Sequence, residues 1–181
     1  MSRYTAPLAD LRFALHDVLA VEAAYRRLPG CEAATRDVID AVLEEAAKFA
    51  EQVLAPLNRS GDAEGCSYDK ATQTVRTPRG FKYALAKYVD GGWIGLTAKE
   101  EFGGQGLSET IGAALKEMID AANLAWGNYP MLSHGASSAL EYHGEDWQRE
   151  VFLKPLVAGT WTVTLSLTET HCGTDLGLLK T

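Results

Sequence analysis

Apolar residues recur at helical spacing along most of this 181-residue chain. The longest pattern extends from Val38 to Leu54, where apolar residues lie three and four positions apart and charged residues fill most positions between them. This spacing is typical of an amphipathic helix with one buried face. Thr35 is a suitable cap for the start of this helix, and Pro56 is expected to end it because proline lacks the backbone N–H that a helix interior needs.

Other segments on either side carry shorter patterns of the same period. Residues 10–26 predict a helix that ends at the Pro-Gly pair following them, whereas residues 58–77 are polar and predict a surface loop. Thr77 followed by Pro78 is a helix-start signal, because threonine can cap a helix and proline is tolerated at its first position. The helix that begins there should end at the pair of glycines that follows it.

Three further helices are expected before the C-terminal segment. Ser108 is placed to cap the first of them, and residues 131–143 and 145–156 carry the other two. The last of the three is expected to bury its large apolar side chains, Trp147, Val151 and Phe152. The glycine-rich stretch 102–107 lacks the spacing and the βαβ setting of a dinucleotide-binding fingerprint, so it predicts a turn before the Ser108 helix.

The hydrophobic pattern changes after residue 160. From there to residue 168 apolar and polar residues alternate strictly, and the apolar positions are Trp161, Val163, Leu165 and Leu167. A period of two with β-branched and aromatic side chains predicts one half-buried strand. The residues after it are small and rich in hydroxyl groups, and Gly173 among them would let the backbone approach a ligand closely.

Composition narrows the class of protein. The chain is 46% hydrophobic and 23% charged, which is ordinary for a globular domain. Its formal net charge is −7 and its basic residues are scattered, so no nucleic-acid partner is expected. No run of about 18 apolar residues occurs, so no membrane span is expected. Cys31, Cys66 and Cys172 are far apart and form no CxxC pair, which favours a reducing, cytoplasmic location over a disulfide framework.

The hydroxyl-rich segment has a recognisable pattern. The sequence LSLTETHCGTD, from Leu165 to Asp175, resembles the flavin-binding signature of the acyl-CoA dehydrogenase family. The positions that match are Leu167, Thr168, Glu169, Gly173, Thr174 and Asp175. The positions that depart are Thr170 in place of proline, Ser166 in place of a small Cys or Ala, and Leu165 in place of an aromatic residue or Met.

Two upstream segments extend this resemblance. Residues 95–107 resemble a glycine-rich loop of the family, and residues 143–160 resemble the helix that precedes its flavin-binding strand. The resemblance therefore covers essentially the whole chain. The His-Cys-Gly-Thr-Asp variant and the long N-terminal lead-in are most similar to the 3-methylmercaptopropionyl-CoA dehydrogenase branch of the family.

The resemblance implies a mainly α fold. Residues 1–159 would form the N-terminal helical domain of the family, with residues 1–34 as a lead-in segment. Residues 160–181 would supply the first strand of the middle β domain and its flavin-binding loop, and the chain would be truncated there. A full-length form would be a homo-oligomer, as is usual in the family.

The resemblance also implies a reaction and a cofactor. Members of the family use FAD for α,β-dehydrogenation of an acyl-CoA thioester in fatty acid metabolism, and pass electrons to an electron-transfer flavoprotein or a similar acceptor. The cofactor-binding residues that it implies are Leu165, Ser166, Leu167, Thr168, Gly173 and Thr174. Thr174 would also contact the acyl-CoA substrate. The catalytic base of the family comes from a C-terminal domain, so no catalytic residue is expected here and the isolated chain is expected to be inactive.

Several residues have competing interpretations. Glu169 lies inside the signature and could act as a base, but a structural carboxylate that anchors the loop is favoured. Asp175 is interpreted as a turn residue. His134 and His143 are nine positions apart, which does not suit a pair of metal ligands on one helix, and no metal site is expected although His171 and Cys172 are adjacent. The alternative functions are a non-catalytic helical interaction module and an inert truncated remnant.

Overall fold

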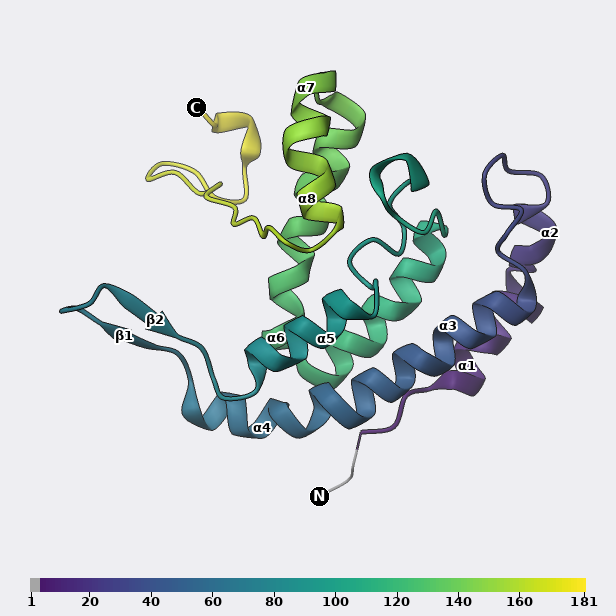
Figure 1. The fold of residues 1–181 in the computed structure, drawn as a ribbon, viewed down its shortest axis with the longest axis horizontal. Coiled ribbons are helices and arrows are strands. Elements are labelled where there is room, and N and C mark those ends of the chain that lie inside the picture. Colours follow the sequence, from purple (N-terminus) through teal and green to yellow (C-terminus); the bar gives the residue numbers. More distant parts are fainter. Residues whose placement is uncertain (1–3) are drawn as a thin grey trace.

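The computed structural model describes residues 4–181, and this part of the chain is mainly α-helical, as the sequence predicted (Figure 1). The helical elements are α1 (Leu8–Arg12), η1 (Phe13–Val18), α2 (Val21–Tyr25), α3 (Arg36–Phe49), η2 (Ala50–Leu54), α4 (Ala55–Glu64), α5 (Phe81–Asp90), η3 (Glu100–Phe102), α6 (Glu109–His143), α7 (Asp146–Gln148), η4 (Arg149–Leu153), α8 (Lys154–Val157) and η5 (Leu176–Leu178). Two strands, β1 (Ser67–Asp69) and β2 (Thr74–Arg76), form a hairpin. Residues 1–3 of the expected lead-in lie outside the described part.

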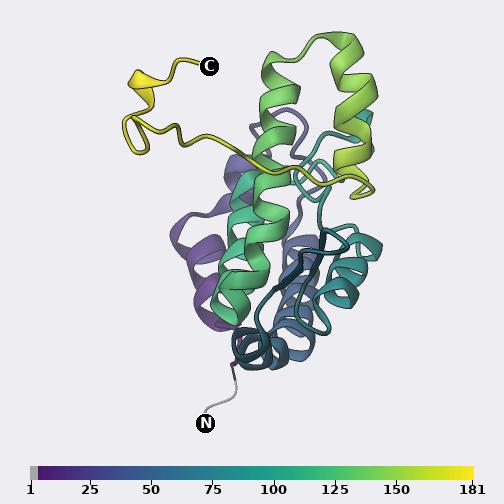
Figure 2. The ribbon, with the colours of Figure 1, turned by 90° about the vertical axis from the view of Figure 1, so that its left-hand side faces the viewer.

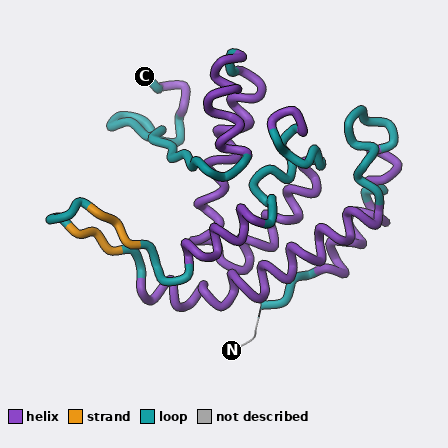
Figure 3. The backbone as a smooth tube through the Cα atoms, in the orientation of Figure 1, coloured by secondary structure: helices purple, strands orange, loops and turns teal. Residues whose placement is uncertain are grey.

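The predicted amphipathic helix is present, but it is longer than expected. The Thr35 side chain accepts a hydrogen bond from the backbone of Val38 at 3.4 Å, so the predicted cap is confirmed. Pro56 does not end the helix: α3, the π-helical turn η2 and α4 follow one another without interruption (Figure 3). The prediction failed because Pro56 directly follows the π-helical turn η2, where the regular i→i−4 hydrogen-bond pattern is already changed and the loss of one N–H does not end the helix.

The polar segment predicted as a loop is also more ordered than expected. Helix α4 continues to Glu64, and the residues after it form the antiparallel hairpin, in which Tyr68 lies opposite Val75. The hairpin extends away from the helices (Figure 1), and all of its strand residues are exposed. Strands of three residues with no buried face leave no alternating pattern in the sequence, which is why they were missed.

Two more boundaries differ from the predictions. The helix predicted over residues 10–26 is divided into α1, which runs directly into η1, and α2. The break between η1 and α2 occurs at Ala20, which adopts a left-handed conformation with φ of 46°. The helix predicted to begin at Thr77 and Pro78 begins at Phe81 instead. Pro78 opens a turn in which its carbonyl accepts from the Phe81 amide, and Gly80 closes that turn with φ of 90°.

Helix α6 combines the two helices predicted after Ser108 into one kinked element, which Figure 2 shows from the side. The kink lies at Asn123, whose backbone is not helical. Its buried side chain compensates, because Oδ1 accepts from the Trp126 amide at 3.1 Å and Nδ2 donates to the Leu54 carbonyl at 3.3 Å. The Ser108 hydroxyl does not cap α6 but hydrogen-bonds the Tyr25 hydroxyl, which ties the lead-in to the start of this helix.

An aromatic cluster in the core lies between the end of α3, α5 and the part of α6 just after its kink. Trp126 is fully buried, and its ring centroid lies 5.8 Å from that of Phe49 and 5.4 Å from that of Tyr88. Its indole N–H donates to the Phe81 carbonyl at 3.2 Å. A buried tryptophan with a satisfied N–H contributes both apolar area and a fixed orientation, so this residue joins the three elements firmly.

The C-terminal elements α7, η4 and α8 pack on the second half of α6, but not through the predicted residues. Trp147 is 56% exposed, Val151 is also exposed, and Phe152 is 37% exposed. The buried residues of this segment are instead Leu153, Leu156 and Val157. The prediction chose the wrong face because the π-helical turn η4 shifts the helical phase by one residue within the segment.

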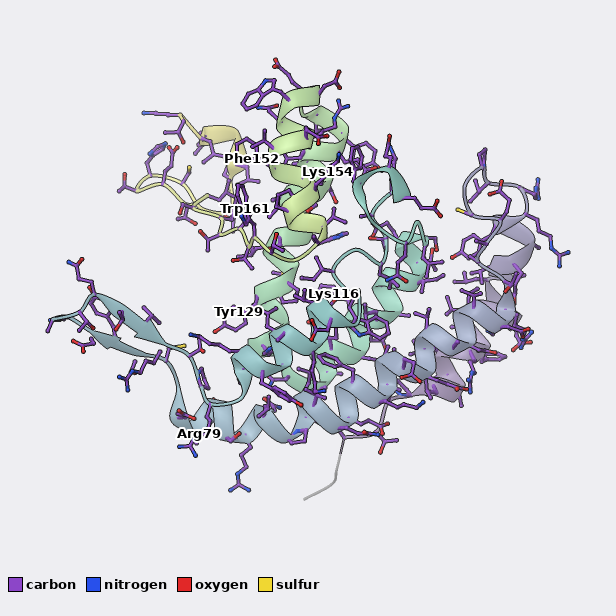
Figure 4. The ribbon with its side chains drawn as sticks, in the orientation of Figure 1. Arg79, Lys116, Tyr129, Phe152, Lys154 and Trp161 are labelled. Carbon is purple, nitrogen blue, oxygen red and sulfur yellow. The ribbon has the colours of Figure 1, made fainter. Side chains whose placement is uncertain are left out.

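The strand predicted after residue 160 does not form within the described residues. The chain leaves α8 and crosses α6 (Figure 2), where the Val163 amide donates to the Ser133 hydroxyl at 3.1 Å. Trp161 is exposed and lies beside Phe152, with 6.2 Å between ring centroids (Figure 4). A strand needs a neighbouring strand to pair its backbone groups, and no such neighbour accompanies this segment in residues 4–181. None of the described helices combines the length and the hydropathy required of a membrane span.

Candidate cofactor loop and adjoining cavity

The segment that resembles a flavin-binding signature folds into a tight turn. The amide of Glu169 donates to the Cys172 carbonyl at 3.0 Å, and the Cys172 amide donates to the Glu169 carbonyl at 3.2 Å. The Glu169 carboxylate then accepts hydrogen bonds from the backbone amides of Lys180 and Thr181 and from the Thr181 hydroxyl. The bond from this hydroxyl is the main cause that lowers the pKa of the Glu169 carboxyl. With its oxygens occupied in this way, Glu169 is suited to anchoring the loop rather than to taking a proton from a substrate.

The residues predicted to bind the cofactor lie on both arms of this turn, and all of them are exposed: Leu165, Ser166, Leu167, Thr168, Gly173 and Thr174. Within residues 4–181, no intramolecular hydrogen bond uses the hydroxyls of Ser166, Thr168 or Thr174. A Cβ added at Gly173 would meet only the Thr168 methyl, at 3.8 Å, so the backbone there is open to approach. Free hydroxyls beside an open backbone fit a ligand rich in hydrogen-bonding oxygens, as FAD is.

Asp175 closes the loop in the predicted way. Its carboxylate oxygen accepts from the Gly177 amide at 3.1 Å at the start of the short 3₁₀ helix η5. This arrangement is an Asx-type turn, which confirms the interpretation of Asp175 as a turn residue. This turn directs the chain that follows Asp175 back toward Glu169, where Lys180 and Thr181 contact the carboxylate.

The glycine-rich stretch before α6 is a closed turn, as predicted. The amide of Gln105 donates to the Gly95 carbonyl at 2.8 Å, and the amide of Gly106 donates to the Ala98 carbonyl at 2.9 Å. A Cβ on Gly104 would lie 2.0 Å from the Ala98 carbonyl oxygen, so only glycine fits there. These bonds occupy the loop amides that a dinucleotide would need, which excludes a phosphate-binding role for this stretch in the observed conformation.

A cavity of about 230 Å³ lies between α5, the loop after it and both halves of α6. Its apolar lining is formed by Tyr88, Trp93, Ile94, Leu96, Ala113, Leu115, Ile119, Pro130 and Met131. An ion pair between Lys116 and Asp120 borders it, as does a contact of 3.5 Å between His134 Nε2 and the Glu109 carboxylate. A largely apolar pocket with a few charged groups at its border is the usual form of a small-molecule site.

This cavity was not predicted from the sequence, because its walls come from distant segments brought together by the kink in α6. One signal was available in Gly112 and Gly127, since glycine is unfavourable inside a helix. A Cβ on Gly112 would lie 2.6 Å from the Thr97 methyl, and a Cβ on Gly127 would lie 2.4 Å from a carboxylate oxygen of Asp120. Both glycines therefore allow a close approach at the border of the cavity.

The histidines lie in different settings. His16 is buried, with Nδ1 2.6 Å from the Glu22 carboxylate and Nε2 3.2 Å from that of Asp40. In the part of the chain that the structure describes, His134 and His143 belong to no group of three potential metal ligands. His171 does belong to one, because its ring, the Glu169 carboxylate and the Cys172 sulfur place their ligand atoms within 4.8 Å of one another.

Comparison with known proteins establishes the family. The family model for the N-terminal domain of acyl-CoA dehydrogenases matches residues 37–160. The chain belongs to the acyl-CoA dehydrogenase family, as the signature and the helical fold had indicated.

Individual relatives agree with this assignment. The chain is 35% identical over 177 residues to 3-methylmercaptopropionyl-CoA dehydrogenase of Ruegeria pomeroyi, covering 98% of this chain and 30% of that protein. It is 32% identical over 186 residues to the broad-specificity linear acyl-CoA dehydrogenase FadE5 of Mycobacterium tuberculosis, covering 100% of this chain and 29% of that protein. A butyryl-CoA dehydrogenase of Syntrophomonas wolfei is 27% identical over 183 residues. The chain thus spans about 30% of the length of these relatives.

Proposed function

We propose that this chain contributes the flavin loop and an acyl-binding wall to an FAD-dependent enzyme that dehydrogenates an acyl-CoA thioester between its α and β carbons. The observation that carries this proposal is the exposed turn with free hydroxyls at Thr168 and Thr174 and an open backbone at Gly173. The family membership supports it, because the relatives are named for dehydrogenation of acyl-CoA thioesters. The same proposal includes a cytoplasmic location, an electron-transfer flavoprotein or similar protein as the electron acceptor, and assembly into a homo-oligomer.

Each loop residue has a distinct part in this proposal. FAD, when bound, accepts the hydride that leaves the β carbon. The Thr168 hydroxyl would donate a hydrogen bond to the edge of the flavin ring, where donors stabilise developing negative charge. The backbone at Gly173 would approach the pyrophosphate, and the Thr174 hydroxyl would donate to it and contact the acyl-CoA. The backbone groups of the residues before Thr168 would extend the cofactor-binding surface, and these residues are Leu165, Ser166 and Leu167.

The cavity beside α6 would receive the apolar part of the acyl group. Its lining is mainly aromatic and aliphatic, and burial of each methylene there would contribute about 0.8 kcal/mol to binding. Lys116 and His134 lie at its border and are each already paired with a carboxylate, so they would not draw a free anion into the apolar space. This assignment favours an acyl chain without a charged end.

No residue of this chain is proposed as the catalytic base. Glu169, the carboxylate nearest to the predicted flavin contacts in sequence, is held by the backbone of Lys180 and Thr181. The family supplies its base from a later domain. The 181-residue chain by itself is therefore expected to bind FAD weakly and to show no turnover, because loss of a general base alone typically lowers a rate by about 10²–10⁴.

The test is direct FAD binding to the 181-residue chain, measured by quenching of flavin fluorescence and followed by an assay with acyl-CoAs and an artificial electron acceptor. Thr168→Val removes the hydroxyl at nearly constant volume and should weaken binding by about 1–3 kcal/mol, while Thr168→Ser keeps the donor and should bind as the parent does. Equal binding by Thr168→Val and the parent would refute the role of Thr168. A stoichiometric yellow protein with measurable turnover would refute the exclusion of Glu169 as a base.

A second function, a non-catalytic interaction module, rests on a different observation. Trp147, Phe152 and Trp161 form a row of exposed aromatic rings with centroids 6.0 and 6.2 Å apart, and this row is the kind of surface that a partner covers. A defined complex with another protein, formed by a chain that binds no FAD, would favour this module over the enzyme.

A further inference from the structure

Three side chains with different metal-binding chemistry meet at the tip of the C-terminal loop. Glu169, His171 and Cys172 belong to one four-residue turn, which is closed by the paired backbone bonds between its first and last residues. Their ligand atoms all lie within 4.8 Å of one another. None of the three is among the residues assigned to the flavin, and His171 and Cys172 occupy positions that the family signature leaves variable.

The distances suit a small tetrahedral ion. Zinc binds sulfur at about 2.3 Å, histidine nitrogen at about 2.0–2.1 Å and carboxylate oxygen at about 2.0–2.2 Å, so its ligands lie roughly 3.3–3.7 Å apart. The Glu169 carboxylate and His171 Nε2 are already 3.3 Å apart. The remaining separations, which are at most 4.8 Å, require only side-chain rotation to close.

The surroundings hold the ligands in place. Glu169 is oriented by the backbone amides of Lys180 and Thr181. His171 Nε2, the nitrogen that faces Glu169, lies 3.0 Å from the Leu178 carbonyl, and this contact would be given up when the nitrogen binds an ion. Hydrogen bonds on a ligating carboxylate, such as those on Glu169, are the usual outer partners of a metal site. Cys172 is 9% exposed, whereas His171 is open to solvent, so water could complete the coordination.

We propose that Glu169, His171 and Cys172 form a binding site for a thiophilic divalent cation, with zinc as the best-fitting ion. The donor set of one sulfur, one nitrogen and one oxygen excludes magnesium and calcium, which prefer oxygen ligands throughout. Glu169 also contacts Lys180 and Thr181, so a bound ion would connect the turn to these residues. The ion would thereby order the loop that carries Thr168 and Thr174.

The test uses the full 181-residue chain in the absence of flavin, after dialysis against a chelator. Zinc is titrated in competition with a chromophoric chelator, and cobalt is then added to report on the ligands. The variants are Cys172→Ala and His171→Ala, and the matched controls are Cys66→Ala, which removes an exposed cysteine beside the hairpin, and His143→Ala. Circular dichroism checks that each variant keeps its helices.

The expected result is one zinc ion per chain, bound equally by the parent, Cys66→Ala and His143→Ala. The Cys172→Ala and His171→Ala chains should bind more than about 100-fold more weakly, because loss of even an outer partner of a ligand costs about 10–100-fold. The cobalt form should show a thiolate-to-metal charge-transfer band that Cys172→Ala lacks. Absence of stoichiometric binding, equal binding by Cys172→Ala, or loss of the band in Cys66→Ala would each overturn the proposal. Because no flavin is present, these outcomes do not depend on the proposed function.

Discussion

The helical core and the segment after residue 160 contain similar apolar side chains but bury them very differently. Trp126 in the core is fully buried and contacts two other aromatic rings, whereas Trp161 in the C-terminal segment is 50% exposed. Leu165 and Leu167 are also exposed, and Cys172 is a buried residue in a segment that is otherwise mostly exposed.

The difference reflects how each kind of element satisfies its backbone. A helix pairs its own N–H and C=O groups, so an apolar stripe needs only another surface to pack against. A strand depends on a neighbour for the same bonds, and the alternating segment has none within the described residues. The same chain can therefore fold a stable helical core and present a loop whose order depends on what binds it.

The largest expected effect contrasts the two tryptophans. Trp126→Ala should destabilise the fold by about 3–5 kcal/mol, because it leaves a cavity among Phe49, Tyr88 and Phe81. Trp161→Ala should change stability by less than about 1 kcal/mol, since half of its surface is already in solvent. Urea unfolding followed by far-UV circular dichroism measures both. Similar losses for the two variants would show that the C-terminal segment is part of the cooperative core.

A second contrast compares two glycines. Gly104→Ala forces its Cβ to within 2.0 Å of the Ala98 carbonyl oxygen, and the loop must open at a cost of about 1–3 kcal/mol. Gly173→Ala meets no atom closer than 3.8 Å and should leave thermal stability unchanged, while weakening FAD binding if the backbone there approaches the cofactor. Thermal melts should show the loss of stability in Gly104→Ala alone, and flavin titrations should show the weaker FAD binding of Gly173→Ala. A stability loss in Gly173→Ala would contradict the view that this glycine serves a ligand.

The smallest effect concerns the lead-in, where charged groups that face α3 add to the burial of apolar residues such as Leu11 and Leu15. Asp40 is partly buried, which opposes ionisation, but hydrogen bonds from Arg12 at 2.8 Å and from His16 at 3.2 Å outweigh this and lower the pKa of its carboxyl. A hydrogen bond from its own backbone amide is the main cause that lowers the pKa of Glu22, and His16 adds to it.

Because both carboxyl pKa values are lower in the folded state, the stability they contribute is present above their unfolded values of about 4. It is lost as the pH falls through the folded values. Asp40→Asn should destabilise the chain by about 1 kcal/mol at neutral pH and should flatten the decline in stability below about pH 4. Asp17→Asn removes an exposed carboxylate of the same lead-in and should leave that decline unchanged. Chemical unfolding at several pH values measures the free energy of unfolding of each variant. Parallel pH profiles of this free energy for Asp40→Asn and the parent would contradict the proposed role of Asp40.

Prediction from the sequence succeeded where one residue pattern is enough. The Thr35 cap and the Asp175 turn are local features, and the structure confirms both. The stripe from Val38 to Leu54 is confirmed from Ile39 onward, whereas Val38 itself is exposed. It failed at Pro56, which follows a π-helical turn and does not end the helix, and at the buried face of residues 145–156, where the π-helical turn η4 shifts the helical phase. The flavin-binding roles of Thr168, Gly173 and Thr174 remain predictions.

The sequence by itself determined the family and the mainly helical class, because similarity to relatives along the chain and stripes of period 3.6 are both read from the order of residues. Tertiary structure alone decided the kink at Asn123, the cavity it opens, and the meeting of Glu169 with the end of the chain. Each of these depends on contacts between residues far apart in sequence, such as Asn123 with Leu54. Their stabilisation comes from packing and hydrogen bonds that exist only once the chain has folded.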